Sequence, residues 1–238
     1  KNENIDGYII SKNDEFFGES VSNDNDRLKF ISNFSGSYGF SLILKNKNYL
    51  FVDGRYTLQA NKQSGSFFKI ITFPDRMPRD VLKNKKFIIG FDPKLFTNEF
   101  LKMFFKNKSC EFKPLKNNLV DKIWKRKTKK NVSKFYTLPS HFSELSYKSK
   151  ITKISSFLKK YSVDFQLVTA SENCAWLLNI RGKDTKYAPI PHCYILIDKH
   201  KNVQVFCDLK KITSSFKKKF NKIKFIDIKN IDKILSNI

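Results

Sequence analysis

The amino-acid sequence predicts an α/β protein built from two tandem units, and three observations support this fold class. Apolar runs with strand character alternate along the chain with stretches whose apolar residues recur at helical spacing. The 238 residues exceed the roughly 100 to 200 residues of a usual single domain, and 40% of them are hydrophobic, which is enough to fill two cores. A pattern of strand, polar loop, strand, aspartate and helix also occurs once in each half.

The first half begins with a strand and alternates strands with helices up to a boundary that we place at 115/116. The expected strands cover 5–10, 40–44, 49–52, 67–72, 85–92 and 110–115. The expected helices are 24–34, the segment that follows the N-cap candidate Asp53, and 98–107. The polar loop 45–48 joins two β-rich runs and therefore predicts a hairpin. This unit, residues 1–115, is the first predicted domain.

The second half is residues 116–238, and its predicted helices and strands follow the basic segment 125–134, which we interpret as a solvated linker. The expected strands beyond it cover 164–170, 192–198 and 203–208. The expected helices cover 147–161, 172–180 and 209–220. Segments 224–228 and 230–238 close the sequence, and we expect this second domain to be truncated at its C-terminal end.

The two halves share an order of motifs. Asn33 precedes a strand, the loop KNKN, a second strand, Asp53 and a helix. Asn179 precedes a strand, the loop DKHKN, a second strand, Asp208 and a helix. We interpret this as a structural duplication, in which the second copy holds extra residues about the size of KDTKYAPIP.

The formal net charge of +24 suggests a polyanionic partner such as nucleic acid or an acidic membrane surface. However, only six of the 46 basic residues are arginine, and lysine is enriched together with asparagine, isoleucine and phenylalanine, which A/T-rich codons encode. The lysines also spread along the whole chain, and a nucleic-acid surface favours arginine forks. We therefore expect no specific nucleic-acid partner, only weak polyanion binding at low salt.

Residues that often carry catalysis are few. The cysteines and histidines are Cys110, Cys174, Cys193, Cys207, His141, His192 and His200. No C-x-x-C pair occurs, so reduced, buried thiols are expected. No two histidines lie four apart, which excludes the common metal-hydrolase signatures. His192 and Cys193 are neighbours on a strand, so they point to opposite faces and form no nucleophile–base pair. The sequence predicts no catalytic and no metal-binding residue.

The sequence also bears on the location of the protein. No apolar run approaches the roughly 18 residues of a membrane span. The first residues, KNENIDGY, lack the apolar core of a signal peptide. We expect a cytoplasmic protein with no membrane partner.

Arg55 is the one residue with a functional character. In FVDGRYTLQA, residues 51–60, it lies at the corner between a strand and a helix. A guanidinium group there projects beyond the sheet edge, where its planar fork matches a carboxylate or a backbone carbonyl of a partner. The alternative is a salt bridge with no function. The residue pattern leaves both interpretations open.

Seven segments carry a resemblance to a known family. In order they are DGYII, NDEFFGESV, RLKFISNFSGSYGFSLIL, LFVDGRYTLQA, NLVDKIW, TLPSHFSELSYKSK and TASENCAWLLNIRGKDTKYAPIPHCYILI. Together they resemble the N-terminal half of the long, three-domain type of Xaa-Pro aminopeptidase, also called aminopeptidase P, a metallopeptidase. The pair DGRY-x-LQA and AWLLN-x-RG is specific at this separation, and the resemblance spans nearly the whole chain.

The resemblance implies two tandem creatinase N-terminal-like domains, each a mixed β-sheet flanked by helices. It implies a parent hydrolase that removes the first residue from peptides with proline in second position. The family holds two divalent metals, commonly manganese, in a C-terminal pita-bread domain, which is absent here. This chain alone is therefore expected to bind no cofactor and to hydrolyse nothing. In similar proteins the DGRY arginine faces the catalytic cleft, which favours a substrate-binding role for Arg55.

The expected partners follow from the same resemblance. They are the C-terminal catalytic domain of the same polypeptide and the peptide substrate, with the parent expected to be a homodimer. The expected role is steric, because these domains restrict and shape access to the cleft. The alternative is a stand-alone basic module that binds acidic partners or nucleic acid. A cysteine-dependent hydrolase is a third, weaker hypothesis.

Overall fold

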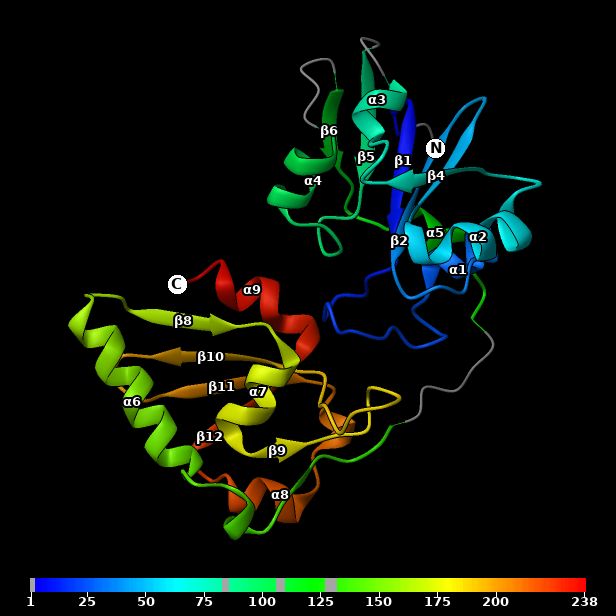
Figure 1. Cartoon of the computed structure of the whole chain (residues 1–238). Coiled ribbons are helices and arrows are strands. Elements are labelled where there is room, and N and C mark those ends of the chain that lie inside the picture. The colour runs from blue at the N-terminus through cyan, green and yellow to red at the C-terminus, as the bar shows by residue number, and fades with distance from the viewer. Residues whose placement is uncertain (1–2, 83–85, 106–109, 127–131) are drawn as a thin grey trace. The chain divides into compact units, whose positions relative to one another are not determined.

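The computed structural model describes residues 3–82, 86–105, 110–126 and 132–238 and divides into two compact units (Figure 1). Unit 1 is Lys1–Thr128 and unit 2 is Lys129–Ile238. Helix α5 (Leu119–Ile123) belongs to unit 1, because its Val120 is buried in the same core as Leu28. The division therefore lies beyond the 115/116 boundary that we expected. The basic segment 125–134 lies partly outside the described residues.

Unit 1 contains a six-stranded mixed sheet with the order β4-β3-β2-β1-β5-β6. Its strands are β1 (Gly7–Ser11), β2 (Gly39–Leu44), β3 (Asn48–Asp53), β4 (Lys69–Phe73), β5 (Phe87–Phe91) and β6 (Cys110–Pro114). Its other helices in the described residues are α1 (Arg27–Ser32), η1 (Gly54–Tyr56), α2 (Thr57–Ser64), α3 (Pro78–Leu82) and α4 (Asn98–Phe105). Strand β2 is antiparallel to both β1 and β3, whereas β3 and β4, β1 and β5, and β5 and β6 pair in parallel.

Both faces of this sheet are covered, so unit 1 has two hydrophobic layers. Because successive strand residues point to opposite faces, Phe51 packs in the layer with helix α4, whereas Leu50 packs in the layer with α1, α2 and α5. Phe40 stacks on Phe51 at 4.8 Å between ring centroids and meets Phe104 edge to face at 5.1 Å. Each fully buried side chain of this size contributes roughly 1.5–3 kcal/mol.

Unit 2 contains a four-stranded mixed sheet with the order β12-β11-β10-β8 and a separate β7-β9 pair. Its strands are β7 (Tyr136–Thr137), β8 (Phe165–Val168), β9 (Ile180–Arg181), β10 (Tyr194–Asp198), β11 (Val203–Cys207) and β12 (Ile223–Asp227). Its helices in the described residues are η2 (Ser140–Phe142), α6 (Tyr147–Lys160), α7 (Ser171–Leu178), η3 (Leu209–Lys211), α8 (Ser214–Lys219), η4 (Ile228–Asn230) and α9 (Ile231–Leu235). Helices α6, α7 and α8 pack on one face of the sheet and α9 on the other.

The predicted duplication agrees with the observed pairing of strands. In unit 1, β2 is antiparallel to β1 and β3, and β3 is parallel to β4. In unit 2, β10 is antiparallel to β8 and β11, and β11 is parallel to β12. Asn33 and Asn179 end helices α1 and α7 in the left-handed conformation, at φ of 61° and 54°. Asparagine tolerates this conformation better than most residues, so it stops each helix before the hairpin.

One expected helix is not continuous. The segment 209–220 forms the short turn η3 and then α8, with a break between them. The break has a local cause, because Asp208 accepts a hydrogen bond from the backbone N–H of Lys210, and Thr213 accepts one from Phe216. Two caps in close succession start two separate helical turns. The short helices α3 and α5 were not predicted, since five residues are too few to show a helical period.

Candidate functional site

The corner at the end of β3 is built by Asp53. Its carboxylate accepts a hydrogen bond from the backbone N–H of Arg55 at 3.0 Å, which turns the chain out of the sheet and into η1. Helix α2 follows directly, so the side chain of Arg55 is placed at the carboxyl end of a strand. The predicted strand-to-helix corner is therefore present.

Arg55 and Asp53 form a side-chain fork at this corner. The Nη2 of Arg55 lies 2.6 Å from Oδ2 of Asp53, and its Nε lies 3.1 Å from Oδ1. The Arg55 side chain is 72% exposed, so water screens the pair. The hydrogen bond from Arg55 lowers the pKa of the Asp53 carboxyl, and the same contact raises the pKa of Arg55. Both groups are charged at neutral pH, and most of the Arg55 side chain faces solvent.

Aromatic side chains hold the corner in place. The guanidinium carbon of Arg55 lies 5.2 Å from the ring centroid of Tyr56, within cation–π range. The hydroxyl of Tyr56 is 2.6 Å from that of Ser37, and its ring meets the buried ring of Phe34 edge to face. Tyr56 is therefore tied to the core, and it supports the arginine without covering it.

The duplication allows a comparison with the matching corner of unit 2. There Asp208 caps the backbone N–H of Lys210, as Asp53 caps that of Arg55. In unit 2 the corner is covered by its own chain, because Lys134 donates to the carbonyl of Lys210 and the N–H of Phe135 donates to that of Lys211. The corner of Arg55 has no such cover among the described residues of unit 1.

The histidines are dispersed. His141 lies beside the ring of Phe142, at 4.3 Å between centroids. The backbone N–H of His192 donates to Asp184, and that of His200 donates to Asp198. Within the described ranges, no three His, Cys, Asp or Glu side chains are grouped so that they fit a metal ion.

Three of the cysteines lie in the core of unit 2. Cys174, Cys193 and Cys207 are fully buried, and the thiol of Cys174 donates to the carbonyl of Cys193 at 3.4 Å. Contact with Cys174, together with burial, raises the pKa of Cys193, and burial raises that of Cys207 to about 12. Because the thiolate is the reactive form, these are inert packing residues.

A feature that sequence reasoning did not find is a pocket of about 430 Å³ in unit 2. It lies between α6, α7 and β9, and it is lined by Lys150, Trp176 and Arg181 among others. Lys150 is one of many lysines, and nothing in the sequence around it indicates a binding site. Arg181, one of six arginines, was the residue whose rarity could have drawn attention to this region.

These features define the class of the protein. It consists of two α/β domains in tandem, with the exposed Arg55 at a strand-to-helix corner of the first. The residues that the structure describes contain no group of side chains that fits a metal ion. Family models described as the creatinase/prolidase N-terminal domain match residues 1–123 and 126–238. The chain belongs to the creatinase/prolidase N-terminal domain family. The predicted fold class and the predicted relationship are thereby confirmed.

Known relatives agree with this assignment. The chain is 32% identical over 209 residues to the probable Xaa-Pro aminopeptidase P of Coprinopsis cinerea, covering 83% of this chain and 33% of that protein. It is 30% identical over 246 residues to aminopeptidase P2 of Arabidopsis thaliana, covering 98% of this chain and 34% of that protein. The chain thus spans about a third of the length of these curated relatives.

A solved structure is similar over almost the whole chain. It is the X-prolyl aminopeptidase of Caenorhabditis elegans, with a TM-score of 0.90 and 26% identity. The match covers 98% of this chain and 40% of the other. That relative is described as a cytosolic enzyme with a di-nuclear active site.

Proposed function

We propose that this chain is the non-catalytic N-terminal portion of an Xaa-Pro aminopeptidase. The parent enzyme removes the first residue from peptides that carry proline in second position. The observation that carries the proposal is the match of family models to both halves of the chain, together with relatives named as Xaa-Pro aminopeptidases. The coverage of about a third of each relative supports a portion of a longer enzyme.

The proposal places the metal chemistry outside this chain. Two divalent ions, with manganese as our candidate, are held by a C-terminal catalytic domain of the same polypeptide. The di-nuclear active site of the Caenorhabditis elegans relative supports two metals in the parent. The described residues of this chain offer no group of ligands that fits a metal. A two-metal site supplies an activated water and stabilises the developing oxyanion.

The role of these two units is then to shape access to the catalytic cleft. A covering domain admits short or flexible peptide ends and excludes folded chains. Arg55 is our candidate for a direct contact with substrate. Its guanidinium group is exposed at the end of β3, while Asp53 and Tyr56 fix its position. The parent is proposed to act in the cytosol as a homodimer, and the cytosolic Caenorhabditis elegans relative supports the location.

A stand-alone basic module is the less favoured function. The comparisons give it no support, because the named relatives are aminopeptidases. Among the helices that the structure describes, none has the length and apolar character needed to cross a bilayer. We interpret the high lysine content as a result of base composition, because asparagine, isoleucine and phenylalanine are enriched with it.

The test compares this 238-residue chain with the complete product of its gene. Both are incubated with manganese and the tripeptide Ala-Pro-Ala, with Ala-Ala-Ala as the matched control. The complete protein is expected to release alanine from the proline peptide only, and this chain from neither. Hydrolysis by this chain alone, or a coding sequence that stops after Ile238, would contradict the proposal.

A further inference from the structure

The pocket of unit 2 has no role in the proposed function. Its volume of about 430 Å³ falls within the roughly 300–1,000 Å³ of sites that bind small ligands. Its lining comes from parts of the chain that are distant in sequence: the segment 142–145 with the start of α6, helix α7 with strand β9, and the segment 189–190. All of these lie within unit 2, so the pocket is complete in one compact unit.

A buried ammonium group lies in the wall of the pocket. Lys150 is buried, with only 5% of its surface exposed. Its Nζ donates to the carbonyl of Trp176 and to Oδ1 of Asn179, both at 2.6 Å, and lies 4.2 Å from the centroid of the Trp176 ring. These partners are neutral. Burial and the nearby Arg181 therefore lower the pKa of Lys150.

A second cation lies close by. The Nη1 of Arg181 donates to the carbonyls of Ile180 at 2.9 Å and Ala175 at 3.3 Å. The guanidinium group of Arg181 has five N–H donors in a planar fork. The two hydrogen bonds that Nη1 donates therefore leave donors for a further acceptor. Both cations lie at the C-terminal end of α7, whose dipole contributes only about half a negative charge. The helix dipole alone therefore does not balance two positive groups.

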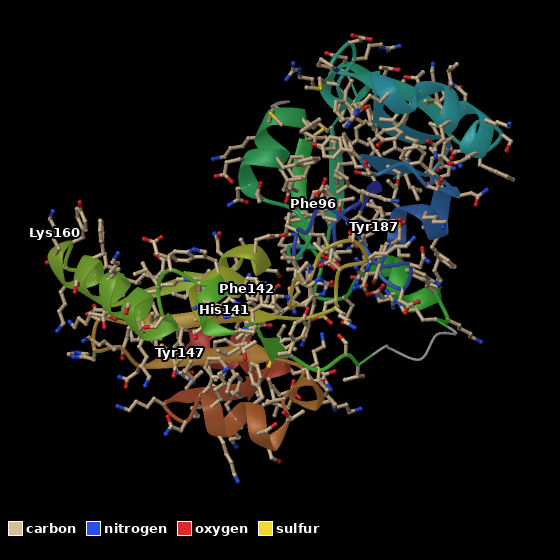
Figure 2. The ribbon with its side chains drawn as sticks, turned by 60° about the horizontal axis from the view of Figure 1, so that its bottom comes forward. Phe96, His141, Phe142, Tyr147, Lys160 and Tyr187 are labelled. Atoms are coloured by element: carbon tan, nitrogen blue, oxygen red, sulfur yellow. The ribbon has the colours of Figure 1, made fainter. Side chains whose placement is uncertain are left out.

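Aromatic surface borders the two cations. Trp176 is 58% exposed and Phe142 is 67% exposed, and both line the pocket. Figure 2 shows Phe142 next to His141 on the surface of unit 2. Exposed aromatic side chains around a hollow are typical of ligand-binding surfaces. They offer an apolar wall to a ligand whose charged group lies against the cations.

Two carboxylates complete the lining. Glu144 and Glu172 line the same pocket, and both residues are exposed. The lining of the pocket therefore contains two cations, two carboxylates and exposed aromatic surface. This pattern matches a ligand that carries one carboxylate, one ammonium group and an apolar side chain.

We propose that this pocket binds short peptides with a free C-terminal carboxylate and an apolar C-terminal side chain. The carboxylate accepts hydrogen bonds from Arg181 in the field of Lys150. The side chain packs against Trp176 and Phe142. In a dipeptide, the N-terminal ammonium group lies toward Glu144 and Glu172. Binding here requires neither Arg55 nor a catalytic domain, so it is separate from the proposed function.

The test uses fluorescence of Trp176 in this 238-residue chain. The chain has two tryptophans, and the Trp124→Phe variant leaves Trp176 as the single reporter. The probe is the dipeptide Ala-Phe, which we expect to change the fluorescence saturably at millimolar concentrations or below. Ala-Phe amide, which lacks the carboxylate, should bind about ten-fold more weakly or worse. Equal binding of the dipeptide and its amide would overturn the proposal, and so would the lack of a saturable change.

Variants separate the site from a general effect of charge. Arg181→Gln should weaken Ala-Phe binding by about ten-fold, whereas Arg76→Gln, an equal change of charge on an exposed residue of unit 1, should leave it unchanged. Equal losses in both variants would refute the site. Circular dichroism checks folding, since Arg181 also bonds to backbone carbonyls. If Arg181→Gln does not fold, Glu172→Gln takes its place. It should weaken Ala-Phe but not N-acetyl-Ala-Phe, and equal effects on both would count against the proposal.

Discussion

Arginine is scarce in this chain, and some of its arginines make contacts that need a planar fork. The clearest case is Arg27, which is 4% exposed and donates to both carboxylate oxygens of Asp121 at 2.9 Å and to Glu15 at 2.7 Å. Arg126 donates to the same Asp121 and lies over the ring of Trp124. This network joins α1, α5 and the segment that follows β1. A lysine, with a single charged nitrogen, cannot make these contacts together.

Arg27→Lys is expected to destabilise unit 1 by about 1–3 kcal/mol. The reason is that the charge stays buried while part of its hydrogen bonding is lost. The measurement is urea unfolding followed by circular dichroism. Arg76→Lys, the same exchange on an exposed residue, is the control and should unfold at the same urea concentration as the native chain. Equal stability of the two variants would mean that the fork at Arg27 contributes nothing.

Asp121 is expected to make the stability of unit 1 depend on pH. Burial opposes its ionisation, but the hydrogen bonds from Arg27 and Arg126 outweigh burial and lower the pKa of Asp121. A lowered pKa in the folded state means that its contribution is present above the ordinary aspartate pKa of about 3.9 and is lost as the pH falls below it. Unfolding midpoints measured at pH 5 and at pH 3 should therefore differ less in Asp121→Asn than in the native chain. The same difference in both proteins would argue against this role.

Arg55→Ala is expected to reduce kcat/KM of the complete enzyme by roughly ten-fold or more, if Arg55 binds substrate as proposed. The domain should remain folded, because the Arg55 side chain is largely exposed and its partner Asp53 keeps the bond to the backbone N–H. The control is Arg76→Ala, which removes another exposed arginine from unit 1. The measurement is kcat/KM of the two variants from steady-state kinetics with a proline-containing peptide. Unchanged kinetics in Arg55→Ala would assign the residue to the salt bridge alone.

At the scale of elements, the helix ends before each hairpin are set by asparagines in the left-handed conformation. Asn33 closes α1, with its N–H bonded to the carbonyl of Lys29 at 2.7 Å. Asn179 closes α7 and also bonds through its side chain to Lys150 and to the carbonyl of Leu145. The first asparagine therefore has a conformational role, and the second has a packing role as well.

Asn33→Ala is expected to destabilise unit 1 by about 1–2 kcal/mol, because a Cβ is unfavourable at this φ without a compensating side-chain contact. Asn33→Gly should retain nearly native stability, since glycine adopts positive φ freely. Thermal unfolding of the two variants is the comparison. If alanine were tolerated as well as glycine, the backbone at residue 33 would not require the left-handed conformation.

At the scale of the whole molecule, each unit has its own sheet and its own core. Phe40 is buried in unit 1 and Phe206 in unit 2, and the core clusters that contain them share no residue. Because each core is contained in one unit, we expect fragments 1–128 and 129–238 to fold separately.

Phe40→Ala is expected to destabilise fragment 1–128, and Phe206→Ala fragment 129–238, by about 3–5 kcal/mol each, the usual cost of removing a buried phenylalanine. In the full chain, each substitution should shift only the unfolding transition of its own unit. Differential scanning calorimetry of the fragments and the full chain measures this. A single transition that both substitutions shift equally would show that the units unfold together.

The sequence by itself determined the alternation of strands and helices, the duplication, the Asp53 corner and the family. These features depend on neighbours along the chain: alternating apolar residues, caps and motifs at short range. Only the tertiary structure decided that α5 belongs to unit 1 and that Lys150 and Arg181 meet in one pocket. Lys150 and Arg181 come from separate elements, and their proximity depends on how α6 packs against α7 and β9. The periodicity of a single segment contains no information about that packing.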